Sequence, residues 1–240
     1  MKDILQDIVA HTHALGFLSL VKVTGGDETA IDARAEDRSV VMSATTSHKI
    51  ASGTFGMSNL DKLALHLKNP EYKDNAKIEV VEAERNGEMV PTHIHFENSA
   101  GDFENDYRFM LKAIIEEQMK SVKFKGASWN VVFNPSVAAI ARMKLMSAAH
   151  SEEPTFNVKT ANGNLVFSFG DASTHAGEFV FQHDVEGKLA HTWSWPVAQV
   201  QSILNLDGDI TMSISDQGAM QISVDSGMAK YDYILPAQSK

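Results

Sequence analysis

The residues of this chain best suited to chemistry are its closely spaced histidines. His93 and His95 stand two positions apart, so on a β-strand both rings would lie on one face and present imidazole nitrogens to a metal ion. Such a site needs a third ligand, and no Asp, Glu or His is spaced near the pair to suggest one. We therefore interpret both as solvent-exposed strand histidines and predict neither a metal site nor a cofactor.

Other catalytic patterns are missing from the sequence. Ser, His and Asp all occur, but no G-x-S-x-G segment forms a nucleophile elbow. Neither a G-x-x-x-x-G-K-[ST] motif nor a G-x-G-x-x-G motif after a strand supports nucleotide binding. The chain has no cysteine, which excludes thiol catalysis and disulfides. His11 and His13, at the end of a predicted helix, suit a structural role against the helix dipole. The sequence predicts a protein that is not an enzyme.

Composition narrows the class further. The 240 residues are 43% hydrophobic, as in ordinary globular proteins, and can form one large domain or two ordinary ones. The net charge of −10 argues against a simple basic nucleic-acid module, unless positive charge gathers on one face. Acidic residues stand near the N-terminus where a signal peptide needs basic and then apolar residues. No apolar run is long enough to cross a bilayer. An intracellular protein without membrane contact is expected.

The elements that would position any site occur twice along the chain. An aromatic-led turn at Phe55 precedes a predicted helix at 58–68, and one at Trp195 precedes a helix at 196–206. A helix at 2–14 opens the first half, with one apolar stripe of Ile4, Leu5, Ile8, Thr12 and Leu15. A helix at about 135–150 opens the second, with Asn134 as N-cap and Pro135 as first helical residue.

Alternating apolar residues predict strands after each helix. In the first half these are 17–23, 39–42, 77–83, 92–97 and 105–112, with a tight turn at Asn86-Gly87. In the second half they are 129–133, 156–160, 164–169, 177–184, 209–215, 219–224 and 230–235, with a hairpin turn at Asn162-Gly163. The predicted fold class is α+β, with two similar β-rich domains, 1–112 and 128–240, each carrying two helices on antiparallel sheets. Residues 113–127 are predicted to be an ordered connector.

Three segments carry a resemblance to a known family. The strand at 106–111 runs directly into the connector, a helix occupies 139–145, and the chain closes on the strand at 229–237. Together with the order of elements, these resemble the DNA sliding clamps of the proliferating-cell nuclear antigen type and of T-even-like phages. The resemblance covers essentially the whole chain as a pattern of elements. The compact length, and a connector that is neither Pro-rich nor strongly acidic, favour a phage-like origin.

The resemblance implies a processivity factor. Three such chains would close into a ring around duplex DNA, irrespective of its sequence, with helices lining the hole and sheets forming the outer wall. A DNA polymerase and a clamp loader would be the partners, and no cofactor is implied. For the contact between chains, we expect residues 107–111 of one chain to pair with 177–184 of the next, because edge strands invite such pairing.

The helix patterns can be tested against this expectation. In the helix at 135–150, the predicted buried stripe is Val137, Ile140, Met143 and Ser147, which leaves Arg142 on the opposite side. Arg142 and Lys144 give this helix a net charge of +2, whereas the helix at 58–68 carries +1, that at 2–14 carries −1 and that at 196–206 none. The helices are thus mildly positive in an acidic chain. The predicted DNA-facing residues are Lys62, His66, Lys68, Arg142 and Lys144.

The resemblance also implies a groove for partner peptides, framed by the connector, the chain end and a first-domain strand. The matching positions are Val40, Met42, Ile114, Ile115, Ile234, Leu235 and Pro236. Two other interpretations stay open. One is a non-enzymatic β-rich structural or assembly protein of a virus, and the other is a metal-dependent hydrolase built on His93 and His95.

Overall fold

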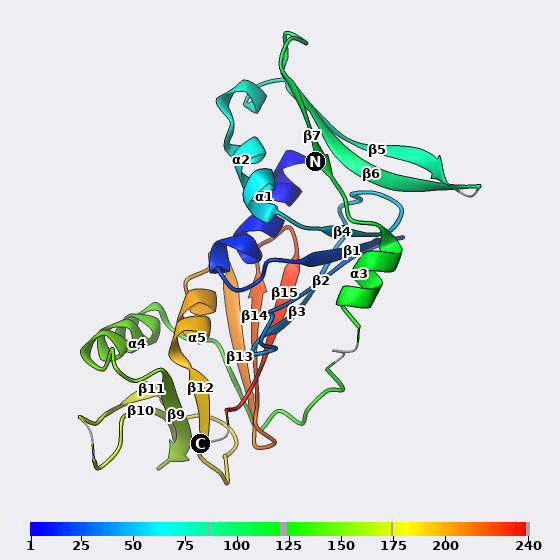
Figure 1. Ribbon diagram of the computed structural model, residues 1–240. Coiled ribbons are helices and arrows are strands. Elements are labelled where there is room, and N and C mark those ends of the chain that lie inside the picture. The colour runs from blue at the N-terminus through cyan, green and yellow to red at the C-terminus, as the bar shows by residue number, and fades with distance from the viewer. Residues whose placement is uncertain (86, 121–123, 174, 239–240) are drawn as a thin grey trace. The chain divides into compact units, whose positions relative to one another are not determined.

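The computed structural model describes residues 1–85, 87–120, 124–173 and 175–238. The chain divides into two compact units, which are described separately (Figure 1). Unit 1 comprises Met1–Lys123 and Ser226–Tyr231, and unit 2 comprises Phe124–Asp225 and Asp232–Lys240. Parts of two predicted features, the turn at 86–87 and the connector at 113–127, lie outside the described residues, namely 86 and 121–123.

Unit 1 begins with α1 (Lys2–His11) and a short 3-10 turn (His13–Leu15). The strands that follow are β1 (Val21–Gly25), β2 (Thr29–Arg34), β3 (Val41–Thr46) and β4 (Gly53–Met57). Then come α2 (Leu60–Lys68), a 3-10 turn (Pro70–Tyr72), β5 (Lys77–Arg85), β6 (Glu88–Glu97), β7 (Glu104–Arg108) and α3 (Lys112–Gln118). The strands pair antiparallel, in the orders β4-β1-β2-β3 and β5-β6-β7.

Unit 2 begins with β8 (Val131–Phe133) and α4 (Val137–Ala149). The strands β9 (Thr155–Ala161), β10 (Asn164–Phe169), β11 (Gly177–Gln182) and β12 (Trp193–Pro196) follow, and then α5 (Val197–Leu204), β13 (Asp209–Ser215) and β14 (Ala219–Asp225). The last strand is β15 (Lys230–Pro236), whose first two residues belong to unit 1. The strand orders are β12-β9-β10-β11 and β15-β14-β13-β8.

The two halves therefore share one topology. In each half the strands between the two helices are arranged fourth-first-second-third, β4-β1-β2-β3 and β12-β9-β10-β11. The predicted duplication and the predicted α+β class with antiparallel sheets are confirmed. The predicted hairpin at Asn162-Gly163 is also confirmed, because both residues have positive φ angles, 52° and 77°, as a tight hairpin turn requires.

Apolar periodicity places the helices of unit 1 correctly. The predicted stripe of α1 is buried, with Leu5 and Ile8 at 0% exposure. In α2 the buried residues are Leu60, Leu63, Ala64 and Leu67, again one face of the helix. The two helices pack against each other and lie side by side (Figure 1). Their apolar faces are the ones that folding removes from water, which is the main stabilising contribution.

A buried polar network holds α1 to the segment 226–231 within unit 1. The Asp7 carboxylate accepts hydrogen bonds from the Tyr231 hydroxyl at 2.7 Å and the Ser226 hydroxyl at 3.0 Å. The His11 ring stacks on Tyr231 with 4.2 Å between centroids, and its Nδ1 lies 3.3 Å from Asp7 Oδ1. Burial alone would raise the pKa of Asp7, but the hydrogen bonds from His11, Tyr231 and Ser226 and the charge of His11 lower it overall.

Both aromatic-led segments are strands, where the sequence predicted turns. Phe55 lies in β4 and Trp195 in β12, buried to 1% and 0% exposure. Each strand directly precedes the second helix of its unit, and the Phe55 ring packs 4.2 Å from that of Phe109. Trp195 also donates its indole N–H to the Leu235 carbonyl at 3.1 Å. β2 was likewise not predicted from the sequence, although it is a regular strand.

The predicted start of α4 is wrong by about two residues, and so is one member of its predicted stripe, Val137. Ser136, not Asn134, is the N-cap, because its hydroxyl accepts the Ala139 N–H at 3.1 Å. Val137 is 85% exposed instead of buried, and the buried residues of the helix are Ala139 and Met143. Met143 is buried as predicted and Ile140 and Ser147 are partly buried, so the buried face begins at Ala139 and not at Val137.

Candidate functional site

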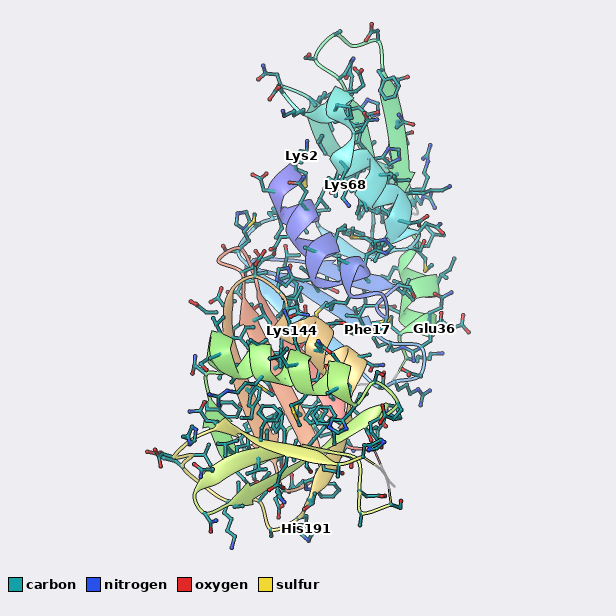
Figure 2. All side chains as sticks on the ribbon, turned by 90° about the vertical axis from the view of Figure 1, so that its left-hand side faces the viewer. Lys2, Phe17, Glu36, Lys68, Lys144 and His191 are labelled. Atoms are coloured by element: carbon teal, nitrogen blue, oxygen red, sulfur yellow. The ribbon has the colours of Figure 1, made fainter. Side chains whose placement is uncertain are left out.

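The second helix of unit 1 presents two exposed cations. Lys62 and Lys68 are both exposed on α2, as predicted, and Lys62 lies opposite the buried leucines. Figure 2 shows Lys68 at the end of this helix. Lys2, at the start of α1, instead donates a hydrogen bond from its ammonium group to the Tyr72 carbonyl at 2.6 Å, so its role is to hold parts of unit 1 together. The exposed lysines of α2 are free to contact an anionic ligand.

His66 differs from the lysines of the same helix. It is only partly exposed, and its ring lies 5.2 Å from that of Phe96 and 6.5 Å from that of Tyr72. Burial lowers the pKa of His66, and the nearby Lys62 charge lowers it further. The imidazole is therefore held in its neutral form at neutral pH. His66 remains at the predicted surface but contributes aromatic packing more than positive charge.

In unit 2 the cations lie on α4. Arg142 and Lys144 are both exposed, and Figure 2 shows Lys144 on this helix. α4 and α5 pack against each other and are joined by a hydrogen bond from the Ser147 hydroxyl to the Gln201 side chain at 3.1 Å. Because α5 carries no charged residue, the positive charge of this helix pair comes from α4 alone.

Exposed apolar side chains accompany these cations, a feature the sequence analysis did not anticipate. Leu65 on α2 is 68% exposed, and Val137 and Leu145 on α4 are 85% and 72% exposed. The sequence of α4 could have indicated them, because small and apolar residues occur on all sides of this helix and form no clear apolar stripe. The exposed helix faces thus combine sparse positive charge with uncharged surface.

Most residues of the predicted partner groove are inaccessible. Val40, Met42 and Leu235 have 0% exposure, and Ile234 has 8%. These side chains fill the cores of their own units, because alternating strand residues point inward. At these four positions the side chains are therefore not exposed to a partner. Ile114, at 44% exposure, and Pro236, which is also exposed, are the members of the set that solvent reaches.

Ile115 has a packing role in unit 1. It is fully buried in α3, and its side chain lies over Gly56 of β4. A Cβ at Gly56 would come within 2.9 Å of Ile115 Cβ and 3.0 Å of Cγ1 and Cδ1, so this glycine permits the close approach. Met110 exchanges backbone hydrogen bonds with the same glycine, at 2.8 and 3.0 Å. The chain after β7 is therefore fixed onto β4.

The edges of two sheets offer backbone for pairing with another chain. β7 is at the edge of the β5-β6-β7 sheet, and β11 is at the edge of the β11-β10-β9-β12 sheet. The predicted pairing segment 107–111 needs correction, since Met110 already pairs with Gly56 and Phe109 donates to the Thr92 carbonyl. The segment 177–184 also extends too far, because β11 ends at Gln182 and Asp184 has a positive φ angle.

The histidine pair is not simply solvent-exposed. His93 and His95 lie on β6 with side chains only 14% and 20% exposed. The structure brings Asp106 of β7 beside them, and the three side chains could together hold a metal ion. Hydrogen bonding from His95, with the charges of His93 and Arg108, lowers the pKa of Asp106. The sequence spacing gave no sign of this third group.

Comparison with known proteins identifies the fold. No protein-family model and no curated protein matches the sequence. Among solved structures, PCNA from Thermococcus kodakaraensis superposes with a TM-score of 0.69 at 10% identity, covering 99% of this chain and 97% of that one.

Two further structures give the same result. A. fulgidus PCNA bound to the C-terminal region of FEN-1 matches with a TM-score of 0.67 at 13% identity, covering 100% of this chain and 95% of that one. Proliferating Cellular Nuclear Antigen from Entamoeba histolytica matches with a TM-score of 0.64 at 10% identity, covering 99% and 94%. This chain has the fold of the PCNA sliding clamps along essentially its whole length. Among the described residues no helix is both long and apolar enough to cross a bilayer.

Proposed function

We propose that this protein is a sliding clamp, a non-enzymatic processivity factor that encircles duplex DNA and tethers a polymerase. The observation that carries the proposal is the match to PCNA structures over 94–97% of their length, with the duplicated strand order present in both halves. Fold likeness at 10–13% identity does not itself assign a function. The charge on the helices and the edges of the sheets supply the independent support.

The DNA-facing surface would be the exposed sides of the helices. Lys62 and Lys68 on α2 and Arg142 and Lys144 on α4 supply positive charge in a chain of net charge −10. Each phosphate contact adds salt-dependent affinity. A clamp must slide, so a few cations among uncharged side chains suit it better than a dense basic surface. Retention on DNA would come from encirclement, and recognition would be independent of sequence.

The ring would contain three copies of the chain, joined through the β7 edge of one copy and the β11 edge of the next. Such a head-to-tail contact closes into a ring when the rotation between copies permits. The strands available for pairing are Glu104–Arg108 and Gly177–Gln182. Neither strand has a second partner strand within the part of the chain that the structure describes.

The polymerase and the clamp loader would be the protein partners. The A. fulgidus PCNA structure holds the C-terminal region of FEN-1, which is consistent with peptide recognition by this fold. In this chain the accessible apolar residues of the predicted groove are Ile114 in unit 1 and Pro236 in unit 2. Each of these side chains is accessible to a partner on its own unit, whereas the other predicted groove residues are buried.

The deciding experiment is the solution mass combined with a low-resolution image. Light scattering at high protein concentration is expected to give three times the chain mass of 26.3 kDa, and negative-stain images should show a closed ring with a hole wide enough for duplex DNA. A strict monomer at high concentration would contradict the proposal, and an open or filled assembly would favour a viral structural or assembly protein.

The absence of cysteine permits a direct map of the contact. R108C with E178C would place thiols on the exposed side chains of both edges, and a bifunctional thiol reagent should then convert the chain into a covalent trimer. Each single variant should give at most a dimer. Moving the first thiol to the opposite edge of the sheet, as in E82C with E178C, should give no trimer.

A further inference from the structure

We propose that His93, His95 and Asp106 form a binding site for one divalent transition-metal ion of the Zn²⁺ class. The site lies on β6 and β7 within unit 1. It does not depend on the proposed clamp function, because all three ligands come from one sheet of one chain. The three donor atoms lie within 4.8 Å of one another.

The sheet itself creates the arrangement. His93 and His95 are alternate residues of β6, so their side chains emerge from the same face. Asp106 is the antiparallel partner of His95 on β7, which places it on that face as well. Two imidazoles and one carboxylate thus converge from two adjacent strands, without help from a loop.

The distances between ligand atoms suit a metal. His93 Nε2 lies 3.5 Å from Asp106 Oδ1, and His95 Nδ1 lies 2.9 Å from the same oxygen. Two ligands bound at about 2.0–2.1 Å in a tetrahedral site are about 3.3–3.5 Å apart. The first pair already has this separation, and the second needs a side-chain movement of about half an ångström to reach it.

Hydrogen bonding leaves the required nitrogen of His93 available. The Thr92 hydroxyl donates its single proton to the Val81 carbonyl at 2.9 Å. The same hydroxyl lies 2.9 Å from His93 Nδ1, so that contact requires Nδ1–H to be the donor. The longer contact of 3.5 Å from the Arg108 guanidinium to Nδ1 would need Nδ1 as acceptor, and it is lost when Arg108 moves away from the site. The tautomer that results carries its lone pair on Nε2, the nitrogen that faces Asp106. Orientation of a ligand imidazole through its other ring nitrogen is typical of metal sites.

The negative charge around the three ligands favours a metal cation, and the Arg108 guanidinium competes with that cation for Asp106. Glu97 and Glu104 have oxygens 3.8 and 3.9 Å from His95 Nε2, the ring nitrogen that does not face Asp106, so they add negative charge near the site without facing the ion. The Arg108 guanidinium lies 3.3 Å from Asp106 Oδ2 and is 70% exposed. In the metal-free protein it partly neutralises the aspartate. Because it is exposed and flexible, it can move away when an ion binds.

The ligand set selects the class of metal. Imidazole nitrogens favour Zn²⁺, Ni²⁺ and Co²⁺, whereas Mg²⁺ and Ca²⁺ prefer sites made of oxygens alone. Three protein ligands leave a fourth position open for water. We therefore expect Zn²⁺ to bind and Mg²⁺ to be rejected.

The test uses the untagged full-length chain after treatment with a chelator. Calorimetric titration should give one saturable Zn²⁺ site per chain and no Mg²⁺ site. H95Q and D106N should each weaken Zn²⁺ binding by at least about 10-fold, as loss of supporting groups alone commonly does. R108Q should bind as tightly as the parent chain or more tightly, since it removes the competing cation.

A matched control exists in unit 2. His191 pairs with Asp216 at 3.0 Å, but this couple has no second histidine beside it among the described residues. H191Q should therefore leave Zn²⁺ binding unchanged. In parallel, Co²⁺ added to the parent chain should develop the strong visible absorption of a four-coordinate site, a signal that needs no variant to fold.

The proposal would be overturned by several results. These are the absence of a saturable Zn²⁺ site, a Co²⁺ spectrum of the weak six-coordinate type, or Zn²⁺ affinity that survives both H95Q and D106N. An equal loss of affinity in H191Q would also overturn it. Far-UV circular dichroism of each variant without metal shows whether lost binding reflects a lost ligand or a lost fold, and D106E then retests the position with a carboxylate retained.

Discussion

Replacing Ile115 with alanine should destabilise unit 1, whereas the same change at Ile114 should not. The two residues are neighbours in α3, but Ile115 is fully buried over Gly56 and Ile114 is 44% exposed. Truncating a buried isoleucine removes apolar contacts and leaves a cavity, at a cost of about 2–5 kcal/mol. Truncating the exposed one should cost less than about 0.5 kcal/mol.

The reciprocal change tests the same contact from β4. G56A would place a methyl group 2.9–3.0 Å from three side-chain atoms of Ile115, and such overpacking costs about 1–3 kcal/mol. In the double variant G56A/I115A, two of those three close contacts disappear and the new methyl partly fills the cavity. The double variant should therefore lose less stability than the sum of the single variants, with a coupling of about 0.5–3 kcal/mol.

Urea unfolding followed by far-UV circular dichroism measures these differences, and hydrogen exchange locates them. All three tryptophans, Trp129, Trp193 and Trp195, belong to unit 2, so their fluorescence reports on that unit separately. I115A should raise amide exchange in α3 and β4. Equal stabilities of I114A and I115A, or strictly additive effects in the double variant, would refute the packing role assigned to Ile115.

Three other predictions concern acid stability, DNA and the partner. The pKa of Asp7 is lowered on folding, so the ionised carboxylate stabilises the fold above the ordinary value of 3.8, and this stabilisation is lost as pH falls through the lower folded value. The variant D7N should therefore be less stable than the parent at neutral pH. Its unfolding free energy should also fall less steeply than that of the parent in this acid range. R142A/K144A should reduce both the retention of the protein on circular duplex DNA and the salt dependence of that retention. Its melting temperature should change no more than that of the control K188A, which replaces an exposed lysine outside the helices. Unchanged retention would place the DNA on another surface. I114D should leave the oligomeric state intact and reduce polymerase stimulation several-fold, and full stimulation would move the partner site away from α3.

Local patterns of the sequence were sufficient for much of the fold. The helices α1 and α2 follow from apolar spacing, and the hairpin between β9 and β10 follows from Asn162-Gly163. The duplication follows from the repeated order of elements. The helices and the hairpin depend on interactions within about ten residues, which a single sequence displays directly.

Features that depend on long-range packing were missed. Phe55 and Trp195 stand next to Gly and Pro, respectively, which indicated turns, yet strand pairing with β1 and β9 overrides that local signal. Val137 was expected to be buried because it is apolar, but the buried face of α4 begins at Ala139 and leaves Val137 exposed in the first turn. The accessibility of the predicted groove residues also depends on packing, which sequence spacing does not report.

The metal cluster shows how a core residue can decide a surface site. Asp106 is 11 residues from His95, a separation with no meaning until the register of β6 and β7 is known. Tyr107 sets that register, because it is 3% exposed and its hydroxyl donates to the Ser58 carbonyl. With Tyr107 held on the core face, alternation forces Asp106 onto the opposite face beside the histidines. A shift by one residue would put Asn105 or Tyr107 opposite His95 and bury the carboxylate. The apolar core, and not the spacing of the ligands, therefore assembles the site.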